Sequence, residues 1–370
     1  MGRLSRAQLQ EHNRAQVLAA ARDEFTEHGF RGAKVDGIAE RAGLTRGAVY
    51  SNFPGKRALY FSVLADLAEH APEPPAPLHA RPEDALAAFA RAWVARLPLA
   101  TDDPRAPARL AADLVPEIIA DERTRLAFAQ LTKLGAILLG LALERLRPPG
   151  SPPARLVRVA EAALTTLHGA SRLAAAAPGF LEPFDVVTVC RELAGLDLGG
   201  RWPLVPQVPA ARPADEPWSP PPALDAVRGE PVALAEEDVV AVLGLHRLEA
   251  AEEAVRAAPP GARVTAVVVT GDPGELAPLA RLAVAEVCGC LRQAFPRAAW
   301  PRLRVVHDPG GAVAAAAGVP AVGDGTEVAV RVRDGRIVAR ADHRGACHAA
   351  ASAAHLDRGS TGGPEDKIRG

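Results

Sequence analysis

Two proline-rich segments limit how this chain can fold, because they divide it into three blocks. The first, residues 71–82, reads APEPPAPLHARP, and the second occupies residues 198–229. Proline lacks a backbone N–H donor and clashes with the preceding helical turn, so no helix is expected to run through either segment. The second segment has the composition of a stiff, extended linker. At 370 residues the chain is also too long for one ordinary core, which favours two or three domains.

The hydrophobic period changes across the second proline-rich segment. Residues 1–70 and 83–197 carry apolar residues at helical spacing, and we expect only helices there. Beyond residue 230, β-branched runs predict strands at 238–243, 264–270, 303–307, 327–333 and 336–341. Helical segments separate the first four runs, and Asp334-Gly335 joins the last two as a tight hairpin. This order implies a mixed sheet with helices on its faces.

The composition favours a cytoplasmic protein without a membrane partner. The longest apolar run, residues 134–143, is half the length of a membrane span and is better explained as a buried helix. Residues 1–14 lack the apolar core of a signal peptide. Four cysteines in 370 residues do not make a disulfide framework, which agrees with a reducing compartment.

Residues 35–53, VDGIAERAGLTRGAVYSNF, predict two short helices around Gly43. Glycine permits the positive φ that a sharp turn between helices needs. Ile38, Leu44 and Val49 have spacings that face a common core. Two helices joined in this way form a helix-turn-helix, whose second helix enters the major groove of DNA. A plain helical corner inside a bundle has the same spacing and is the alternative.

The exposed residues of the second helix favour DNA binding over the plain corner. Thr45 can cap the helix, whose N-terminus then offers backbone N–H groups to phosphate. Gly47 costs about 1 kcal/mol relative to alanine within a helix, but it lets the backbone approach DNA closely. We expect Tyr50 and Lys56 to contact phosphates, and Arg46 and Ser51 to contact base edges. Residues 1–62 also hold ten Lys/Arg against six Asp/Glu, a mild basic bias.

Residues 10–62 resemble the N-terminal domain of the TetR family of bacterial transcriptional regulators. The resemblance is carried by AAARDEFTEHGF (19–30) and IAERAGLTRGAVYSNFPGKRALY (38–60). It implies a homodimer whose paired recognition helices bind a palindromic operator in double-stranded DNA. It also implies that the DNA-contacting positions are Thr45, Arg46, Gly47, Tyr50, Ser51 and Lys56. Where the family usually has Thr or Ser capping the first helix of the motif, this chain has Ala33-Lys34, and we expect Lys34 to supply a phosphate contact instead.

Residues 83–197 correspond in position and helix content to the ligand-binding and dimerisation domain of that family. The analogy places the last two helices, 153–176 and 183–195, in a four-helix bundle shared between two subunits. A pocket for a small-molecule effector of unknown identity would lie among the earlier helices, with candidate lining residues Phe89, Trp93, Phe128, Leu131 and Leu138. Ordinary core packing is the alternative explanation for these five residues.

The C-terminal block resembles a thioredoxin-like domain of the peroxiredoxin type, through residues 307–319 and 327–342. Redox activity in that fold needs a low-pKa cysteine at a helix N-terminus after the first strand, and GLHRLEAA (244–251) contains none. We therefore expect a degenerate scaffold without catalytic residues. Cys288 and Cys290 are best explained as small buried hydrophobes, with redox sensing as the alternative. Their spacing relative to His307 or His348 is not that of a structural zinc site, so no metal is expected.

The sequence thus predicts a multidomain fold in which TetR-like all-α domains precede an α/β domain. The expected parts are a helix-turn-helix DNA-binding domain (1–70), an all-α ligand-binding and dimerisation domain (83–197), a proline-rich linker (198–229), a thioredoxin-like α/β domain (230–356) and a flexible tail (357–370). The expected function is a non-enzymatic, cofactor-free TetR-type regulator, a repressor released by its effector. The alternative is a thiol-based redox protein or redox-sensing regulator.

Overall fold

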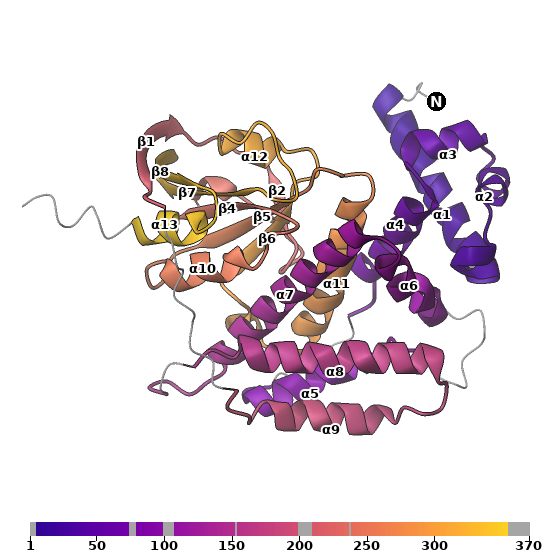
Figure 1. The fold of residues 1–370 in the computed structure, drawn as a ribbon, viewed down its shortest axis with the longest axis horizontal. Helices are drawn as coiled ribbons and strands as arrows, with labels where there is room; N and C mark the ends of the chain where they lie inside the picture. The colour runs from indigo at the N-terminus through magenta and orange to yellow at the C-terminus, as the bar shows by residue number, and fades with distance from the viewer. Residues whose placement is uncertain are drawn as a thin grey trace, which may run out of the picture. The chain divides into compact units, whose positions relative to one another are not determined.

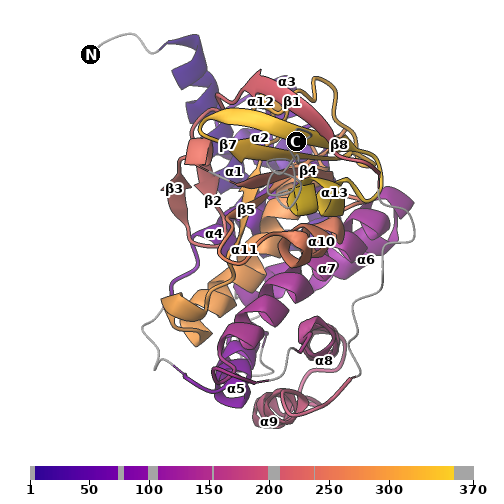
Figure 2. The same ribbon diagram turned by 90° about the vertical axis from the view of Figure 1, so that its left-hand side faces the viewer.

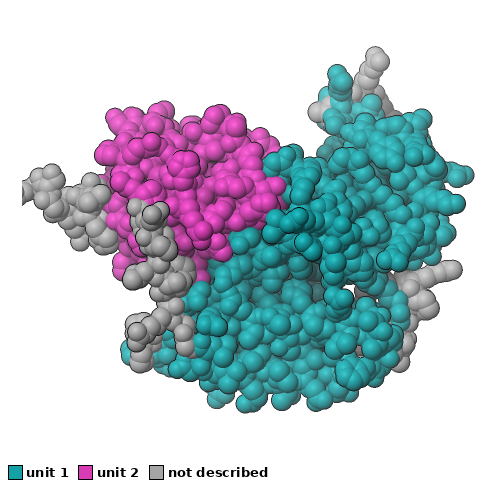
Figure 3. All heavy atoms as spheres, viewed as in Figure 1, with its two compact units in different colours: residues 1–202, 226–228, 270–301 teal, residues 203–225, 229–269, 302–370 magenta. Residues whose placement is uncertain are grey.

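The computed structural model describes residues 5–73, 79–98, 107–151, 154–198, 209–236 and 238–353. The chain forms two compact units, which Figure 3 distinguishes by colour. Unit 1 comprises residues 1–202, 226–228 and 270–301, and unit 2 comprises residues 203–225, 229–269 and 302–370. The flexible tail predicted for 357–370 lies outside the described residues, and the predicted domain bounds stay a prediction.

The N-terminal part of unit 1 consists of one long helix and three shorter ones, packed around aromatic side chains. They are α1 (Arg6–Gly32), α2 (Val35–Arg41), α3 (Arg46–Asn52) and α4 (Lys56–Glu69) (Figure 1). The rings of Phe25 and Tyr60 meet edge to face, with centroids 5.4 Å apart, and Phe30 lies 4.9 Å from Tyr60. Edge-to-face contacts of this kind add to the burial energy of the rings. Tyr60 therefore joins α4 to α1 at the centre of this core.

The rest of unit 1 is also helical, in agreement with the prediction for 83–197. Its helices are α5 (Pro82–Val94), a 3-10 turn (Pro107–Asp113), α6 (Leu114–Ile119), α7 (Glu122–Arg145), α8 (Val157–Ala176) and α9 (Pro183–Leu193). Within the described residues, α7 alone is long and apolar enough to cross a membrane. However, 67% of its most apolar window is buried inside the protein, as expected for a core helix.

Unit 1 also contains a helix from the C-terminal block, α11 (Leu276–Ala294). This helix packs against α4, α5 and α7 (Figures 1 and 2). The approach to α7 is close, because a Cβ atom on Gly135 would lie 3.0 Å from a methyl group of Val287. The range 230–356 was predicted as one α/β domain, yet α11 within it belongs to the compact helical unit.

Unit 2 contains the mixed sheet that the sequence predicted. Its strands are β1 (Arg212–Pro217), β4 (Val239–Gly244), β5 (Val264–Val269), β6 (Leu303–His307), β7 (Glu327–Arg333) and β8 (Arg336–Asp342), in the order β1-β8-β7-β4-β5-β6. Strands β4, β5 and β6 are parallel, whereas β7, β8 and β1 pair in an antiparallel manner. Asp334 (φ 50°) and Gly335 (φ 72°) form the predicted hairpin turn, which requires positive φ at both positions.

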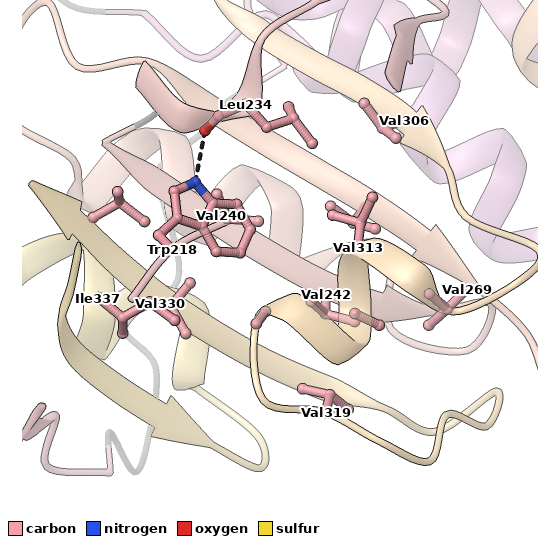
Figure 4. Close-up of a cluster of buried hydrophobic side chains, with 14 residues drawn as sticks. Trp218, Leu234, Val240, Val242, Val269, Val306, Val313, Val319, Val330 and Ile337 are labelled. Atoms are coloured by element: carbon pink, nitrogen blue, oxygen red, sulfur yellow. Dashed lines mark hydrogen bonds between the residues drawn. The ribbon is translucent and has the colours of Figure 1, made fainter. Parts of the chain in front are cut away.

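Shorter elements complete unit 2. Strands β2 (Ala223–Asp225) and β3 (Glu230–Val232) form a separate antiparallel pair. Helices α10 (Ala250–Ala257) and α13 (Ala346–Ser352) contact each other. Helix α10 packs against β4 and β5, and α13 packs against β7 and β8. Helix α12 (Ala312–Ala316) contributes Val313 and Ala314 to a buried cluster with Val240, Val242 and Val330 (Figure 4). The central strands are thus buried, which explains their near-continuous β-branched sequence.

Residues 212–218 are part of the sheet, so the predicted linker of 198–229 does not extend over them. Strand β1 pairs with β8 at the edge of the sheet, with Arg212 opposite Arg340. Proline is tolerated at an edge because no further strand needs its missing N–H group. Trp218 follows the strand, is 4% exposed, and donates from Nε1 to the Leu234 carbonyl oxygen at 2.8 Å (Figure 4). The proline content of this segment concealed its strand.

We expect Trp218 to hold β1 on the sheet edge. Trp218→Ala would cost about 3–5 kcal/mol because a large buried side chain is lost. Trp218→Phe keeps most of the packing and loses mainly the hydrogen bond to Leu234, at about 1 kcal/mol. Hydrogen–deuterium exchange of the β8 peptide in the full chain should accelerate strongly in the alanine variant and slightly in the phenylalanine variant. Leu224→Ala, at a side chain that is 56% exposed, is the control. Unchanged β8 exchange in Trp218→Ala would contradict the anchoring role.

Candidate nucleic-acid interface and ligand cavity

Helix α3 begins and ends through local contacts that its sequence predicts. The Thr45 hydroxyl accepts the Ala48 backbone N–H at 3.2 Å and thereby caps the first turn. Gly43 has φ 65°, the conformation that the turn between α2 and α3 requires. Val49 and Phe53 are each 2% exposed and attach the helix to the core. The helix-turn-helix geometry therefore follows from residues within this segment.

Helix α2 receives its cap from α1 instead of from its own sequence. The Lys34 backbone N–H donates to Glu24 Oε1 at 3.2 Å, and Arg41 Nε donates to Glu24 Oε2 at 2.9 Å. Glu24 is only 6% exposed, and a Cβ atom on Gly37 would lie 2.9 Å from its carboxylate. A carboxylate at a helix N-terminus satisfies free N–H groups and complements the helix dipole. Sequence analysis missed this cap because Glu24 lies ten residues before Lys34.

The side chains of Lys34, Arg46, Tyr50 and Ser51 are exposed, as their expected role requires. The Arg46 guanidinium lies 5.5 Å from the centroid of the Tyr50 ring, and its Nη1 is 3.3 Å from Asp36. The Ser51 hydroxyl donates to the Ala48 carbonyl oxygen at 2.8 Å, which leaves its oxygen able to accept a further hydrogen bond. Their contacts with DNA stay a prediction.

The position of Gly47 is open on the side where a side chain would project. A Cβ atom there would meet only the Thr45 hydroxyl, at an ordinary contact distance of 3.8 Å. The fold of the domain therefore does not require glycine in this helical turn. A requirement that comes from outside the chain, such as close approach of DNA to the backbone, is consistent with this geometry.

Lys56, expected as a phosphate anchor, has an internal role as well. Its Nζ donates to the Arg31 carbonyl oxygen at 3.3 Å and lies 4.7 Å from the centroid of the Phe30 ring. Burial lowers the pKa of its ammonium group. Lys56 thus joins the first turn of α4 to the last turn of α1.

Arg14 supports α3, and sequence analysis did not identify it. Its Nη1 donates to the Asn52 carbonyl oxygen at 3.2 Å, and its guanidinium lies 4.4 Å from the centroid of the Phe53 ring. A cation at the C-terminus of a helix is favourable because free carbonyl groups gather there. Burial lowers the pKa of the guanidinium, and the charge of Arg281 acts in the same direction.

Unit 1 contains a largely apolar cavity of about 390 Å³ among α5, α6, α7, α8 and α11. Trp93 and Phe128, two of the five predicted lining residues, lie on its wall. The other three, Phe89, Leu131 and Leu138, are fully buried in the core and do not line it. Polar lining residues that the sequence analysis missed are Arg96, His168, Ser171, Arg172 and Glu286. They come from distant segments, so no local pattern could bring them together.

The cysteines have the character of core residues. Cys190, Cys288, Cys290 and Cys347 are all buried, and none of the four is in a disulfide. Burial raises the pKa of the Cys190 thiol to about 11 and that of Cys290 to about 12. A thiol with a raised pKa carries little of the reactive thiolate. Within the described ranges, no group of His, Cys, Asp or Glu side chains is arranged to hold a metal ion.

The helix-turn-helix region matches known proteins. The family model for bacterial regulatory proteins of the tetR family covers residues 17–63. The HTH-type transcriptional regulator RutR of Escherichia coli is 41% identical over 51 residues, which cover 14% of this chain and 24% of RutR. The uncharacterized HTH-type transcriptional regulator TtgW of Pseudomonas putida is 42% identical over 65 residues, which cover 18% of this chain and 48% of TtgW.

Solved structures include a TetR transcriptional regulator from Rhodococcus sp. RHA1. It aligns with 50% of this chain and 94% of its own, at 17% identity and a TM-score of 0.33. The chain spans about a quarter of the length of RutR. The thioredoxin-like fold expected for 230–356 gains no support from these comparisons and stays a prediction. Residues 17–63 therefore match the family model for bacterial regulatory proteins of the tetR family and are similar to the corresponding part of RutR.

Proposed function

We propose that the whole protein is a TetR-type transcriptional repressor in the cytoplasm, which binds a palindromic operator as a homodimer and is released by a small molecule. The observation that carries this proposal is the capped, exposed first turn of α3, within the segment that matches the family. Paired recognition helices of a dimer read half-sites about 34 Å apart, so a ligand that changes their spacing lowers operator affinity.

The proposed DNA contacts are the exposed groups on and beside α3. Backbone N–H groups at the α3 N-terminus, together with Tyr50, Lys34 and Lys56, would bind phosphates. Arg46 and Ser51 would read base edges, since arginine pairs with guanine in the major groove. The contact of Arg46 with Asp36 is exposed at both side chains, so DNA can replace it at low cost.

Exposed apolar side chains on the outermost helices support a homodimer. Helices α8 and α9 lie side by side (Figure 2), and they and the loop between them carry Leu173, Phe180, Phe184 and Val189, each at least 41% exposed. Two phenylalanines that are 73% and 78% exposed are unusual on a monomer. A second copy of the chain that buries this surface would complete the four-helix bundle suggested by the family.

The cavity in unit 1 supports a small-molecule effector. Its volume of about 390 Å³ is in the range of drug-sized ligand sites, which are mostly apolar with a few polar groups. We propose no catalytic residue and no cofactor. The raised pKa values of the buried thiols favour this regulator over the redox alternative. The alternation of strands and helices in unit 2 supports a thioredoxin-like scaffold without its cysteine.

Binding to DNA upstream of its own gene would test the central proposal. The full chain should shift this fragment at low salt, and affinity should fall steeply as salt rises because phosphate contacts release counterions. Tyr50→Ala and Lys56→Ala should weaken binding to all sequences, whereas Arg46→Ala should change the preferred sequence. Fluorescence anisotropy measures the DNA affinity of each variant. Absence of binding to any neighbouring intergenic DNA at low salt would contradict the regulator proposal.

Gly47→Ala should separate the demands of folding from those of DNA binding. Alanine fits the open position and has higher helix propensity, so the domain should gain up to about 1 kcal/mol of stability. The added methyl group lies where the backbone approaches DNA, and we expect affinity to fall about tenfold, or about 1.4 kcal/mol. Thermal unfolding and anisotropy measure the two effects. A variant that is more stable and binds as well as wild type would show that α3 does not approach DNA through Gly47.

Phe180→Asp with Phe184→Asp should shift the protein from dimer to monomer, because charges would replace the apolar surface of α8 and α9. Analytical ultracentrifugation measures the shift, and operator affinity should fall with it. Leu224→Asp, at another exposed apolar side chain, is the matched control and should leave the dimer intact. A double variant that remains dimeric would place the subunit interface elsewhere.

A further inference from the structure

One residue of the cavity lining comes from α11, a helix that lies outside the sequence range 83–197 predicted for the ligand-binding domain. Glu286 of α11 lines the cavity together with Trp93 and Arg96 of the α5 region and His168 of α8. The aromatic part of the wall is compact, since the His168 ring meets Trp93 at 5.0 Å and Phe128 at 5.8 Å. The cavity therefore presents aromatic surfaces next to a carboxyl group.

Two of the polar side chains that line the cavity are either hydrogen-bonded within the protein or uncharged. Ser171 accepts a hydrogen bond from Trp93 Nε1 at 3.0 Å and donates to the Leu167 carbonyl oxygen at 3.0 Å. Burial lowers the pKa of His168 to about 4, so its imidazole is neutral near pH 7. Arg172 is exposed to solvent.

Arg96 is committed to holding α11. Its Nη1 donates to the backbone carbonyl oxygen of Glu286 at 3.3 Å. Its Nη2 is buried without a hydrogen-bond partner and would lie 2.8 Å from a Cβ atom on Gly289, so this nitrogen is packed against the backbone of α11. An anionic ligand would have to move the Arg96 guanidinium away from α11 to reach Nη2, and this movement would break the hydrogen bond between Nη1 and the Glu286 carbonyl oxygen.

The Glu286 carboxyl group, by contrast, has no hydrogen bond or ion pair with any residue that the structure describes. Burial raises its pKa to about 7, and the charge of Arg96 acts in the opposite direction. Glu286 is partly buried. A carboxylate that is partly removed from water and lacks a partner carries a desolvation cost, and a ligand that supplies a positive charge or an N–H donor lowers that cost. Glu286 is therefore a group in the cavity lining that can favour a cationic ligand over a neutral or anionic one.

We propose that Glu286 makes the cavity selective for ligands that combine an aromatic, apolar body with a protonated amine. The aromatic body would pack against Trp93 and Phe128, and the ammonium group would pair with the carboxylate of α11. This inference rests on the proposed function, in which the cavity binds the effector, and it adds the chemical class of that effector.

Three probes of matched size test the selectivity on the full-length protein: 1-naphthylmethylamine, 1-naphthalenemethanol and 1-naphthoate. Isothermal titration calorimetry at pH 8 should give the amine at least tenfold higher affinity than the alcohol, with the carboxylate weakest. Glu286→Gln should remove the preference for the amine and leave alcohol binding nearly unchanged. Glu122→Gln, at an exposed position on α7, is the matched charge control and should behave as wild type.

A pH series on the wild-type protein provides a test that needs no variant. Because the carboxyl group is ionised above pH 7 and protonated below it, amine affinity should fall about tenfold between pH 8 and pH 6. The other groups that face Glu286 do not titrate in this window. The His168 imidazole is already neutral, because burial lowers its pKa to about 4, and burial raises the pKa of Tyr60 further above this range. Alcohol affinity should therefore be constant.

The outcomes separate this inference from the proposed function. Equal binding of amine and alcohol, tighter binding of the carboxylate, or amine binding unaffected by Glu286→Gln would each overturn the selectivity while leaving the cavity as a binding site. Failure of all three probes to bind would overturn the cavity as an effector site, and this inference with it.

Discussion

Arg57, in the first turn of α4, joins three helices of unit 1 at one point. Its Nη2 lies 2.8 Å from Asp121, the N-cap of α7, and its Nε lies 2.7 Å from Glu275, directly before α11. The three side chains are 21–31% exposed, so water screens these charges only in part. Removing one partner would leave partly buried charges unpaired, which is far more costly than losing a surface ion pair. Because α4 directly follows α3, this junction fixes where the helix-turn-helix begins relative to α7 and α11.

The sequence predicted the parts of the site whose causes are local. Thr45 caps α3 through a hydrogen bond that spans three residues, and Gly43 turns the chain within the motif, so both could be recognised from residue type and spacing. The caps and supporting contacts that come from distant parts of the sequence could not be recognised in this way. Glu24 caps α2 across ten residues, and Arg14 reaches the end of α3 across 38. Both residues look like ordinary charged positions on a long exposed helix, because nothing in their neighbourhood distinguishes them.

The same limit applies to the larger architecture. Strands β4 to β8 were predictable, since β-branched runs and a hairpin turn act over a few residues. The membership of α11 in the helical unit was not, because it depends on pairs such as Arg57 with Glu275, which are 218 residues apart. Strand β1 was not predicted from the sequence, for a different reason. Its prolines predict a linker, and only pairing with β8 and the burial of Trp218 show that an edge strand tolerates them.

The position of α11 connects the two properties of unit 1 that matter for regulation. The helix is tied to the end of α4 by the pair of Arg281 with Glu69, and to its beginning through Glu275 and Arg57. Glu286, which lines the cavity, lies on α11 between Arg281 and the C-terminal end of the helix. A helix is stiff and α11 is attached to α4 at two points. A ligand that displaces Glu286 would therefore tend to displace α4 as well. In the proposed regulator, an element that contacts both the cavity and α4 can couple ligand binding to DNA binding, and α11 is such an element.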